Sequence, residues 1–178
     1  MTDTRTDADP LAADDRDASV CPGCGAVVAV VPGLPAGHPG ASAGCARLFE
    51  VTVRGLRDDA ARDAGAAALL QLATDAYDAQ HLVDGGPTAP VVRLCLETDR
   101  GLDPQRAGEL AAAVDAAAPA RLTPPVRWAT TLADIAADLD VVDLPALVRS
   151  WADAVWRDWS AGASGGPVRA AADTVLGR

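Results

Sequence analysis

The sequence contains no lysine, and all 15 of its basic residues are arginines. Its 25 acidic residues outnumber them, so the formal net charge is -10 and the pI is about 4.4. Binding to a nucleic-acid backbone requires patches of basic residues, and this balance therefore argues against a general nucleic-acid-binding protein. We expect a soluble chain whose partners are proteins or small molecules, with no nucleic-acid partner.

Long apolar runs and the features of a secretory signal are also missing. No stretch approaches the roughly 20 apolar residues that a membrane-spanning helix needs. Residues 1–19 lack a basic region and an apolar run, and we interpret them as a disordered acidic leader. We therefore expect a cytoplasmic protein with no membrane partner, in which four cysteines are more often thiols or metal ligands than disulfides.

Aromatic residues are scarce, at 3% of the chain, and four of the six are tryptophans. Three of these, Trp151, Trp156 and Trp159, fall in one segment with apolar residues at helical spacing. They could line a ligand pocket, but in so alanine-rich a chain they are better explained as the main large side chains of the core.

The periodicity and capping signals predict a mostly α protein, a helical bundle with a small N-terminal zinc-knuckle and β element. The run AVVAVV (26–31) predicts a short strand or half of a hairpin, and prolines make 118–128 an extended connector. We divide the chain into a leader (1–19), a zinc-knuckle segment (20–44) and a helical domain packed against it (45–178). Helices are expected from Ser42 to about Leu56, from Asp58 or Asp59 to about His81, at 89–99, from Asp103 to about 117, at 131–138, at 144–159 after Asp143, and at 167–176.

The stretch CPGCG (21–25) has the spacing of a zinc knuckle. Thiolates at Cys21 and Cys24 face one ion across a tight turn that glycine permits. Cys45 would lie in the first turn of the helix capped by Ser42, where the helix dipole favours a thiolate. His38 is the nearest candidate for the fourth ligand, which completes the pattern C-x2-C-x13-H-x6-C.

Several alternatives to this metal site remain open. His81 can reach the ion from the end of a long helix in place of His38, and iron is possible in place of zinc. The CxxC pair can also be a redox pair or simply unliganded thiols. The fourth cysteine, Cys95, lies between two leucines and is interpreted as a small buried core residue.

The stretch TDAYDAQH (74–81) is the main candidate for catalysis. Tyr77 and His81 are four residues apart on a helix, and Asp78 lies on a neighbouring face. His81, Tyr77 and Asp78 could serve as acid, base or orienting groups around a metal. In the alternative, Tyr77 packs in the core and His81 ends the helix. We find no phosphate loop, dinucleotide fingerprint or GxSxG nucleophile.

Five segments in order resemble a family of small uncharacterised bacterial proteins of the CPGCG type, catalogued as a domain of unknown function. They cover residues 21 to 159 and are CPGCGA, H…GAS-x-GC, DAY-x-x-QH, LCL-x-x-x-RGL and R-x-WA-x-x-VW-x-x-W. The resemblance implies metal binding by Cys21, Cys24 and Cys45, and a role beyond helix packing for Tyr77, Gln80 and His81. It implies no known reaction.

The chain departs from that family pattern at three positions. Ala43 stands where the pattern has proline, Ala46 where it has tryptophan, and Pro90 where it has histidine. If the family uses that histidine, this chain lacks it. The leading hypothesis is a zinc-stapled helical binding or accessory protein, the second is a metal-dependent hydrolase, lyase or group transferase for a small molecule, and the third is a zinc-redox sensor.

Overall fold

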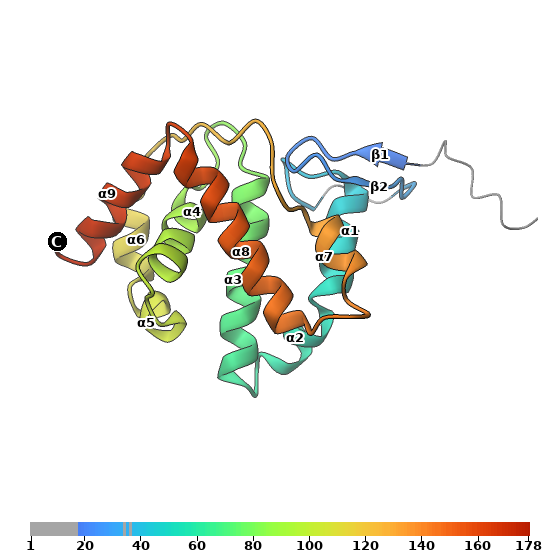
Figure 1. Ribbon diagram of the computed structural model, residues 1–178, viewed down its shortest axis with the longest axis horizontal. Helices are drawn as coiled ribbons and strands as arrows, with labels where there is room; N and C mark the ends of the chain where they lie inside the picture. The colour runs from blue at the N-terminus through green and yellow to red at the C-terminus, as the bar shows by residue number, and fades with distance from the viewer. Residues whose placement is uncertain (1–17, 34, 36) are drawn as a thin grey trace, which may run out of the picture.

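The computed structural model describes residues 18–33, 35 and 37–178, and this part of the chain is mostly helical, as predicted. A two-stranded sheet lies at one end with α1 and α7, and α5, α6 and α9 lie at the other (Figure 1). The elements are β1 (Ala18–Val20), β2 (Val27–Ala29), α1 (Ala43–Thr52), α2 (Arg54–Asp59), α3 (Ala64–Gln80), α4 (Ala89–Leu94), the π-helical turn η2 (Cys95–Asp99), α5 (Pro104–Glu109), α6 (Ala111–Ala117), α7 (Leu132–Ala137), α8 (Leu144–Ala161) and α9 (Gly165–Val175).

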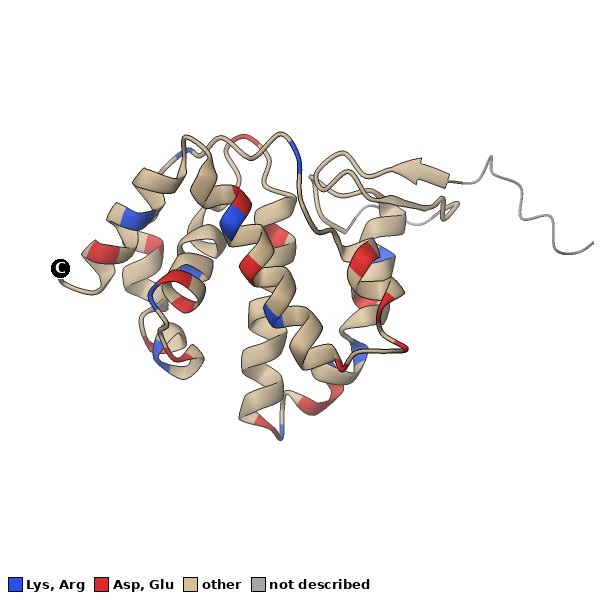
Figure 2. Cartoon of the chain, in the orientation of Figure 1, with Lys and Arg blue, Asp and Glu red and all other residues tan. Residues whose placement is uncertain are grey.

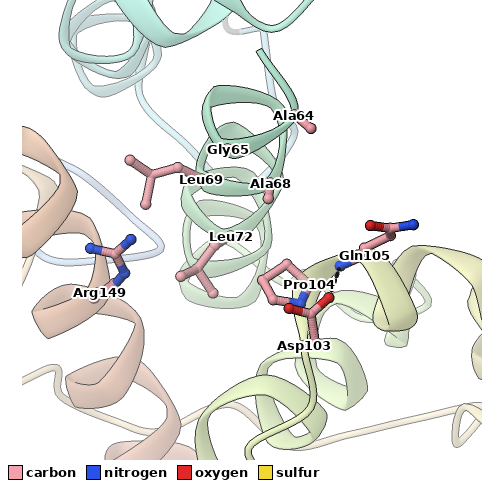
Figure 3. A pocket seen from close by; sticks show the side chains of 9 residues that line it. All are labelled: Ala64, Gly65, Ala68, Leu69, Leu72, Asp103, Pro104, Gln105 and Arg149. Atoms are coloured by element: carbon pink, nitrogen blue, oxygen red, sulfur yellow. Dashed lines mark hydrogen bonds between the residues drawn. The ribbon is translucent and has the colours of Figure 1, made fainter.

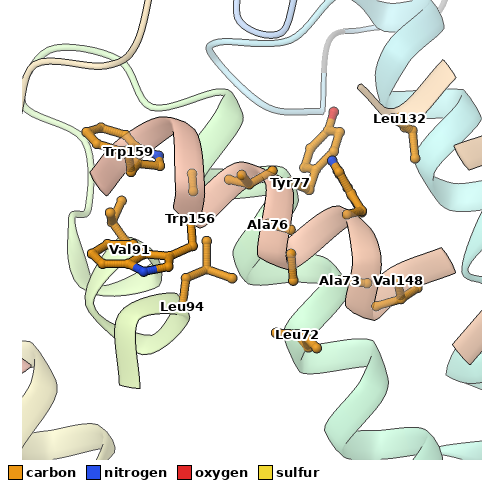
Figure 4. Packing of buried hydrophobic residues seen from close by; sticks show 14 of the residues in the cluster. Leu72, Ala73, Ala76, Tyr77, Val91, Leu94, Leu132, Val148, Trp156 and Trp159 are labelled. Carbon is orange, nitrogen blue, oxygen red and sulfur yellow. The ribbon is translucent and has the colours of Figure 1, made fainter. Parts of the chain in front are cut away.

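Helices α3 and α8 form the centre of the helical body. Ala73 and Ala76 on α3 are fully buried, and their small side chains let α8 approach closely (Figure 4). Trp151 and Trp159 of α8 are also buried, which confirms their assignment to the core. Burying a large apolar side chain contributes about 1.5–3 kcal/mol, so these tryptophans supply much of the stability of an alanine-rich bundle.

The helix starts follow their capping residues, with one correction. Ser42 caps α1 as predicted, and Asp103 and Asp143 cap α5 and α8. The helix predicted from Ser42 to about Leu56 is instead two helices, α1 and α2, and the long helix predicted from Asp58 or Asp59 begins later, at Ala64. Asp63 caps α3, because its carboxylate accepts hydrogen bonds from the backbone N–H groups of the first turn.

The N-terminal unit is a hairpin without charge. Strand β1 pairs antiparallel with β2, and Val20 faces Val27 across the pair. Ala18 and Ser19, assigned to the leader above, belong to β1, and residues 1–17 lie outside the described part. No charged residue occurs between positions 18 and 46, so this unit carries none of the charges that are scattered over the helices (Figure 2).

The predicted connector fastens this unit to the helical body. It runs without helix from residue 119 to 131. The indole Nε1 of Trp128 donates to the carbonyl of Gly23 at 3.0 Å. Gln80, the last residue of α3, donates to Thr130 O at 2.7 Å and accepts from Trp151 Nε1 at 3.1 Å. Because Gln80 is hydrogen-bonded on both sides, the position of His81, the next residue, is fixed as well.

Two features complete the interior. Asp75, 1% exposed, forms a two-oxygen ion pair with Arg93 that links α3 to α4. Cys95 is fully buried at the start of η2, as expected of a core residue, and burial raises the pKa of its thiol to about 12.

None of the helices in the described chain has the length and apolar character that crossing a bilayer would require.

Candidate metal centre

Three cysteines and one histidine converge at the junction of the N-terminal unit and the helical body. The ligand atoms of Cys21, Cys24, Cys45 and His81 all lie within 4.8 Å of one another, and all four residues are buried. His81 Nε2 is 3.4 Å from Sγ of both Cys21 and Cys45, and the Cys24 and Cys45 sulfurs are 3.8 Å apart. Sulfurs bound at about 2.3 Å to a tetrahedral ion stand roughly 3.8 Å apart, so the spacing fits one zinc-sized ion.

A tight turn presents the first two sulfurs. The backbone N–H of Cys21 donates to Ala26 O at 2.8 Å, and that of Gly25 donates to Cys21 O at 2.9 Å. Gly25 has a φ of 76°, in the left-handed region that glycine adopts without strain. The N–H of Ser42 points at the Cys21 sulfur at 3.4 Å, an interaction that favours its thiolate form.

Two glycines let this turn fold against the end of α3. A Cβ on Gly23 would lie 2.6 Å from Gly40 O and 2.7 Å from His81 Cδ2. A Cβ on Gly40 would lie 2.0 Å from His81 O. A side chain at either position would therefore push the N-terminal unit away from His81.

The third sulfur comes from α1. Cys45 lies in the first turn, and its N–H donates to the Ser42 hydroxyl at 3.2 Å, as the sequence predicts. Negative charge is stabilised at this end of a helix by the free N–H groups and the helix dipole. The thiol of Cys45 is therefore placed where a metal-bound thiolate is favourable.

His81 ends α3 with its ring already oriented. Its Nδ1 lies 2.6 Å from the carbonyl of Tyr77, one turn earlier, so Nδ1–H donates to that oxygen. With that proton on Nδ1, Nε2 is the nitrogen that faces the sulfurs and could bind an ion. A backbone carbonyl that fixes the tautomer in this way is typical of metal-bound histidines.

The structure places His38, our first candidate for the fourth ligand, outside this group. Its Nδ1 accepts a hydrogen bond from Gly40 N at 3.1 Å, and its Nε2 lies 3.8 Å from Asp78 Oδ1. Its ring packs edge-on against His81, with centroids 5.7 Å apart. The bond to Gly40 turns His38 toward Asp78, and the end of α3 brings the alternative ligand, His81, to the sulfurs.

The protonation of the four groups is strongly coupled. Hydrogen bonds from Cys24 and Cys45 lower the pKa of Cys21, whereas acting as the donor raises the pKa of Cys45. Burial opposes a charge on His81, but the thiols of Cys21 and Cys24 raise its pKa to about 9. The shared protons are those that a cation would displace, because metals bind thiolates and neutral imidazole.

Tyr77 supports His81 from the side. Its ring lies between Phe49 and His81, with centroids 4.3 Å and 4.2 Å away. Tyr77 is 4% exposed, and its hydroxyl has no hydrogen-bond partner among the described residues. Burial, reinforced by the nearby cysteine thiolates, raises the pKa of this phenol well above its usual range. Tyr77 is thus a neutral donor beside the centre.

A cavity of about 400 Å³ opens beside the centre, and we call it the α1–α3 cavity. Its walls include Arg47, Phe49, His38, Tyr77 and Asp78. Two of the three sequence-based catalytic candidates therefore line it, while the third, His81, lies behind them.

A second hollow, of about 300 Å³, lies between α3, α5 and α8 (Figure 3). Leu69 on α3 lines it, twelve residues before His81, which is roughly 18 Å along a helix. Asp103 faces it but is already engaged with Gln105 N as the α5 cap. This hollow has no connection to the metal centre.

Gln80 is a residue whose role the residue pattern alone does not indicate. It makes no contact with the sulfurs, yet it holds the end of α3 through Thr130 and Trp151. Only the family resemblance, which includes the QH pair, singles it out.

Comparison with known proteins yields one family and no characterised relative. The model of a family of unknown function, DUF5946, matches residues 19–160. No curated protein and no solved structure matches the chain. The matched region contains all four residues of the candidate metal centre and also Trp128 and Trp151, which bond to Gly23 and Gln80. The chain belongs to the DUF5946 family.

Proposed function

We propose that this protein is a small zinc-binding module. One zinc ion, bound by three cysteines and one histidine, fastens the N-terminal hairpin to a helical body, and the helical body binds a partner. The observation that carries the proposal is the convergence of four buried ligand atoms from three separate segments within 4.8 Å. Without an ion, the four buried groups would share protons through hydrogen bonds. An ion would displace those protons and be coordinated by the same four atoms.

Zinc suits the donor set better than the other common ions. Three thiolates and one imidazole at tetrahedral spacing are a frequent structural zinc set, and hard cations such as magnesium prefer oxygen ligands. Iron also binds thiolates and remains the alternative metal.

A closed site favours a binding or accessory role. Structural zinc sites use four protein ligands, whereas catalytic ones keep a position for water or substrate. Here Cys21, Cys24, Cys45 and His81 fill all four positions. A metal-dependent hydrolase, lyase or transferase is the second candidate, and the α1–α3 cavity with Tyr77 and Asp78 is the observation in its favour.

Cobalt substitution separates the two candidates. A closed Co2+ site with three thiolates should give an intense tetrahedral visible spectrum that added azide does not alter. An azide-dependent spectrum would indicate an open position and favour the enzyme. As a matched pair, Cys45→Ser should lose the metal and Cys95→Ser should retain it, because Cys95 lies in the core away from the cluster.

A further inference from the structure

The α1–α3 cavity has the size and composition of a small-molecule site. Its volume of about 400 Å³ falls within the range of ligand pockets. Ala46, Phe49 and Tyr77 supply apolar surface. Figure 4 shows the Tyr77 ring leaving α3 with its hydroxyl away from the packed aliphatic cluster.

The charges around the cavity are not equally available. Arg57 is paired with Glu50, with one nitrogen–oxygen distance of 3.1 Å, so these two neutralise each other. Arg47 is exposed at the rim, where water screens its charge. Asp78 is more enclosed, with its side chain 29% exposed.

Asp78 is an enclosed wall charge without a close counterion. Within the described residues, its one salt-bridge contact is His38 Nε2, at 3.8 Å, too far for a hydrogen bond. His38 already accepts from Gly40 N through Nδ1, so its Nε2 carries the proton in the neutral ring. A cation placed beside Asp78 would meet a carboxylate and the aromatic rings of His38 and Tyr77.

We propose that the α1–α3 cavity binds a small primary amine with an apolar body, its ammonium group on Asp78 and its body against Ala46, Phe49 and Tyr77. The net charge of -10 would draw such a cation toward the protein. The proposal rests on the proposed function, because it names the ligand class of the binding module. Since Tyr77 and His38 also touch His81, the ligand would share a wall with the metal centre.

The test uses zinc-loaded full-length protein and three isosteric probes: benzylamine, benzyl alcohol and benzoate. Calorimetry and amide NMR shifts should report benzylamine binding at His38 and Tyr77. The alcohol and the benzoate should bind at least about tenfold more weakly. Asp78→Asn should weaken benzylamine binding by about tenfold or more, and Ala46→Trp should abolish it by filling the cavity. Asp115→Asn, at an exposed position of α6, is the control and should bind as the wild type does.

Three results would overturn the proposal: no benzylamine binding, equal binding of alcohol or benzoate, or unchanged binding in Asp78→Asn. Zinc content is measured in every sample. If zinc is stoichiometric and benzylamine does not bind, the ligand assignment fails and the zinc module stands. If zinc is absent from the wild type, the proposed function fails first.

Discussion

At the scale of single residues, His81 is where the helical body meets the candidate metal centre. Its Nδ1 donates to Tyr77 O, its Nε2 faces two sulfurs, and its ring packs at a tilt against that of Tyr77. His38, although closer to the cysteines in sequence, makes none of the sulfur contacts. The two histidines therefore have different predicted consequences when replaced.

We predict that His81→Ala weakens zinc binding by on the order of a hundredfold or more, at least as much as loss of a supporting residue would. His38→Ala should change it by less than about tenfold, because His38 lies outside the ligand group. Competition with a zinc-binding dye measures both. Loss of zinc in His38→Ala with retention in His81→Ala would reverse the ligand assignment.

Glu97 gives a pH-dependent prediction far from the metal ligands. Burial raises its pKa from 4.5 to about 7, with Asp75 adding to the effect and Arg93 opposing it. The folded state thus keeps a proton that the unfolded chain releases. Because the folded-state pKa is the higher one, the free energy of unfolding falls as pH rises between about 4.5 and 7.

Glu97→Gln should remove that dependence. The free energy of unfolding of the variant minus that of the wild type should increase by about 1 kcal/mol between about pH 6 and pH 8. Urea unfolding of both proteins at these pH values provides the measurement. A stability difference that stays constant across the range would show that Glu97 titrates normally in the fold.

At the scale of elements, the N-terminal turn depends on close approach to α3. Gly23→Ala places a Cβ 2.6 Å from a backbone oxygen and 2.7 Å from the His81 ring. We predict that it weakens zinc binding by at least about tenfold while the helical circular dichroism signal stays close to that of the wild type. Gly55→Ala is the matched control, because a Cβ there meets nothing within 4 Å and helix α2 tolerates alanine. Equal zinc affinity in the two variants would contradict this account of the turn.

Most elements were predictable because their signals are local. Ser42, Asp103 and Asp143 cap the helices expected of them, and the prolines at 119–125 keep the connector extended. The boundary between α2 and α3 was not predictable, because Asp58, Asp59 and Asp63 are equally good caps by local chemistry. Which of them starts the long helix depends on tertiary packing.

The candidate site likewise has a part that local signals predict and a part that depends on tertiary packing. The CxxC turn and Cys45 follow from spacing and helix capping, but the choice between His38 and His81 depends on how the end of α3 meets the hairpin. That contact rests on Gln80, Trp128 and the glycines, whose partners are far away in sequence. No pattern of neighbouring residues reports such contacts.

At the scale of the whole molecule, the proposed ion joins two parts that differ in how stable each would be on its own. The hairpin unit is small, uncharged and without a core of its own. The helical body is held by α3, α8 and their tryptophans, and by the buried Asp75–Arg93 pair. Small units of this kind usually need a metal or disulfides for stability.

We therefore predict that removing zinc with a chelator disorders residues 20–50 and leaves most of the helical signal. Far-UV circular dichroism should change little, whereas Trp128 fluorescence should change, because its indole bonds to Gly23. A Trp128→Phe variant identifies that part of the fluorescence. Complete loss of helix on chelation would mean that the two parts do not fold separately.

The most direct test of the central claim is X-ray absorption at the zinc edge of natively purified protein, with the zinc content of the same sample measured. We predict one zinc per chain, bound by three sulfurs at about 2.3 Å and one nitrogen at about 2.0 Å. Protein that is folded and reduced but contains no stoichiometric metal, or a metal shell dominated by oxygen, would contradict the account.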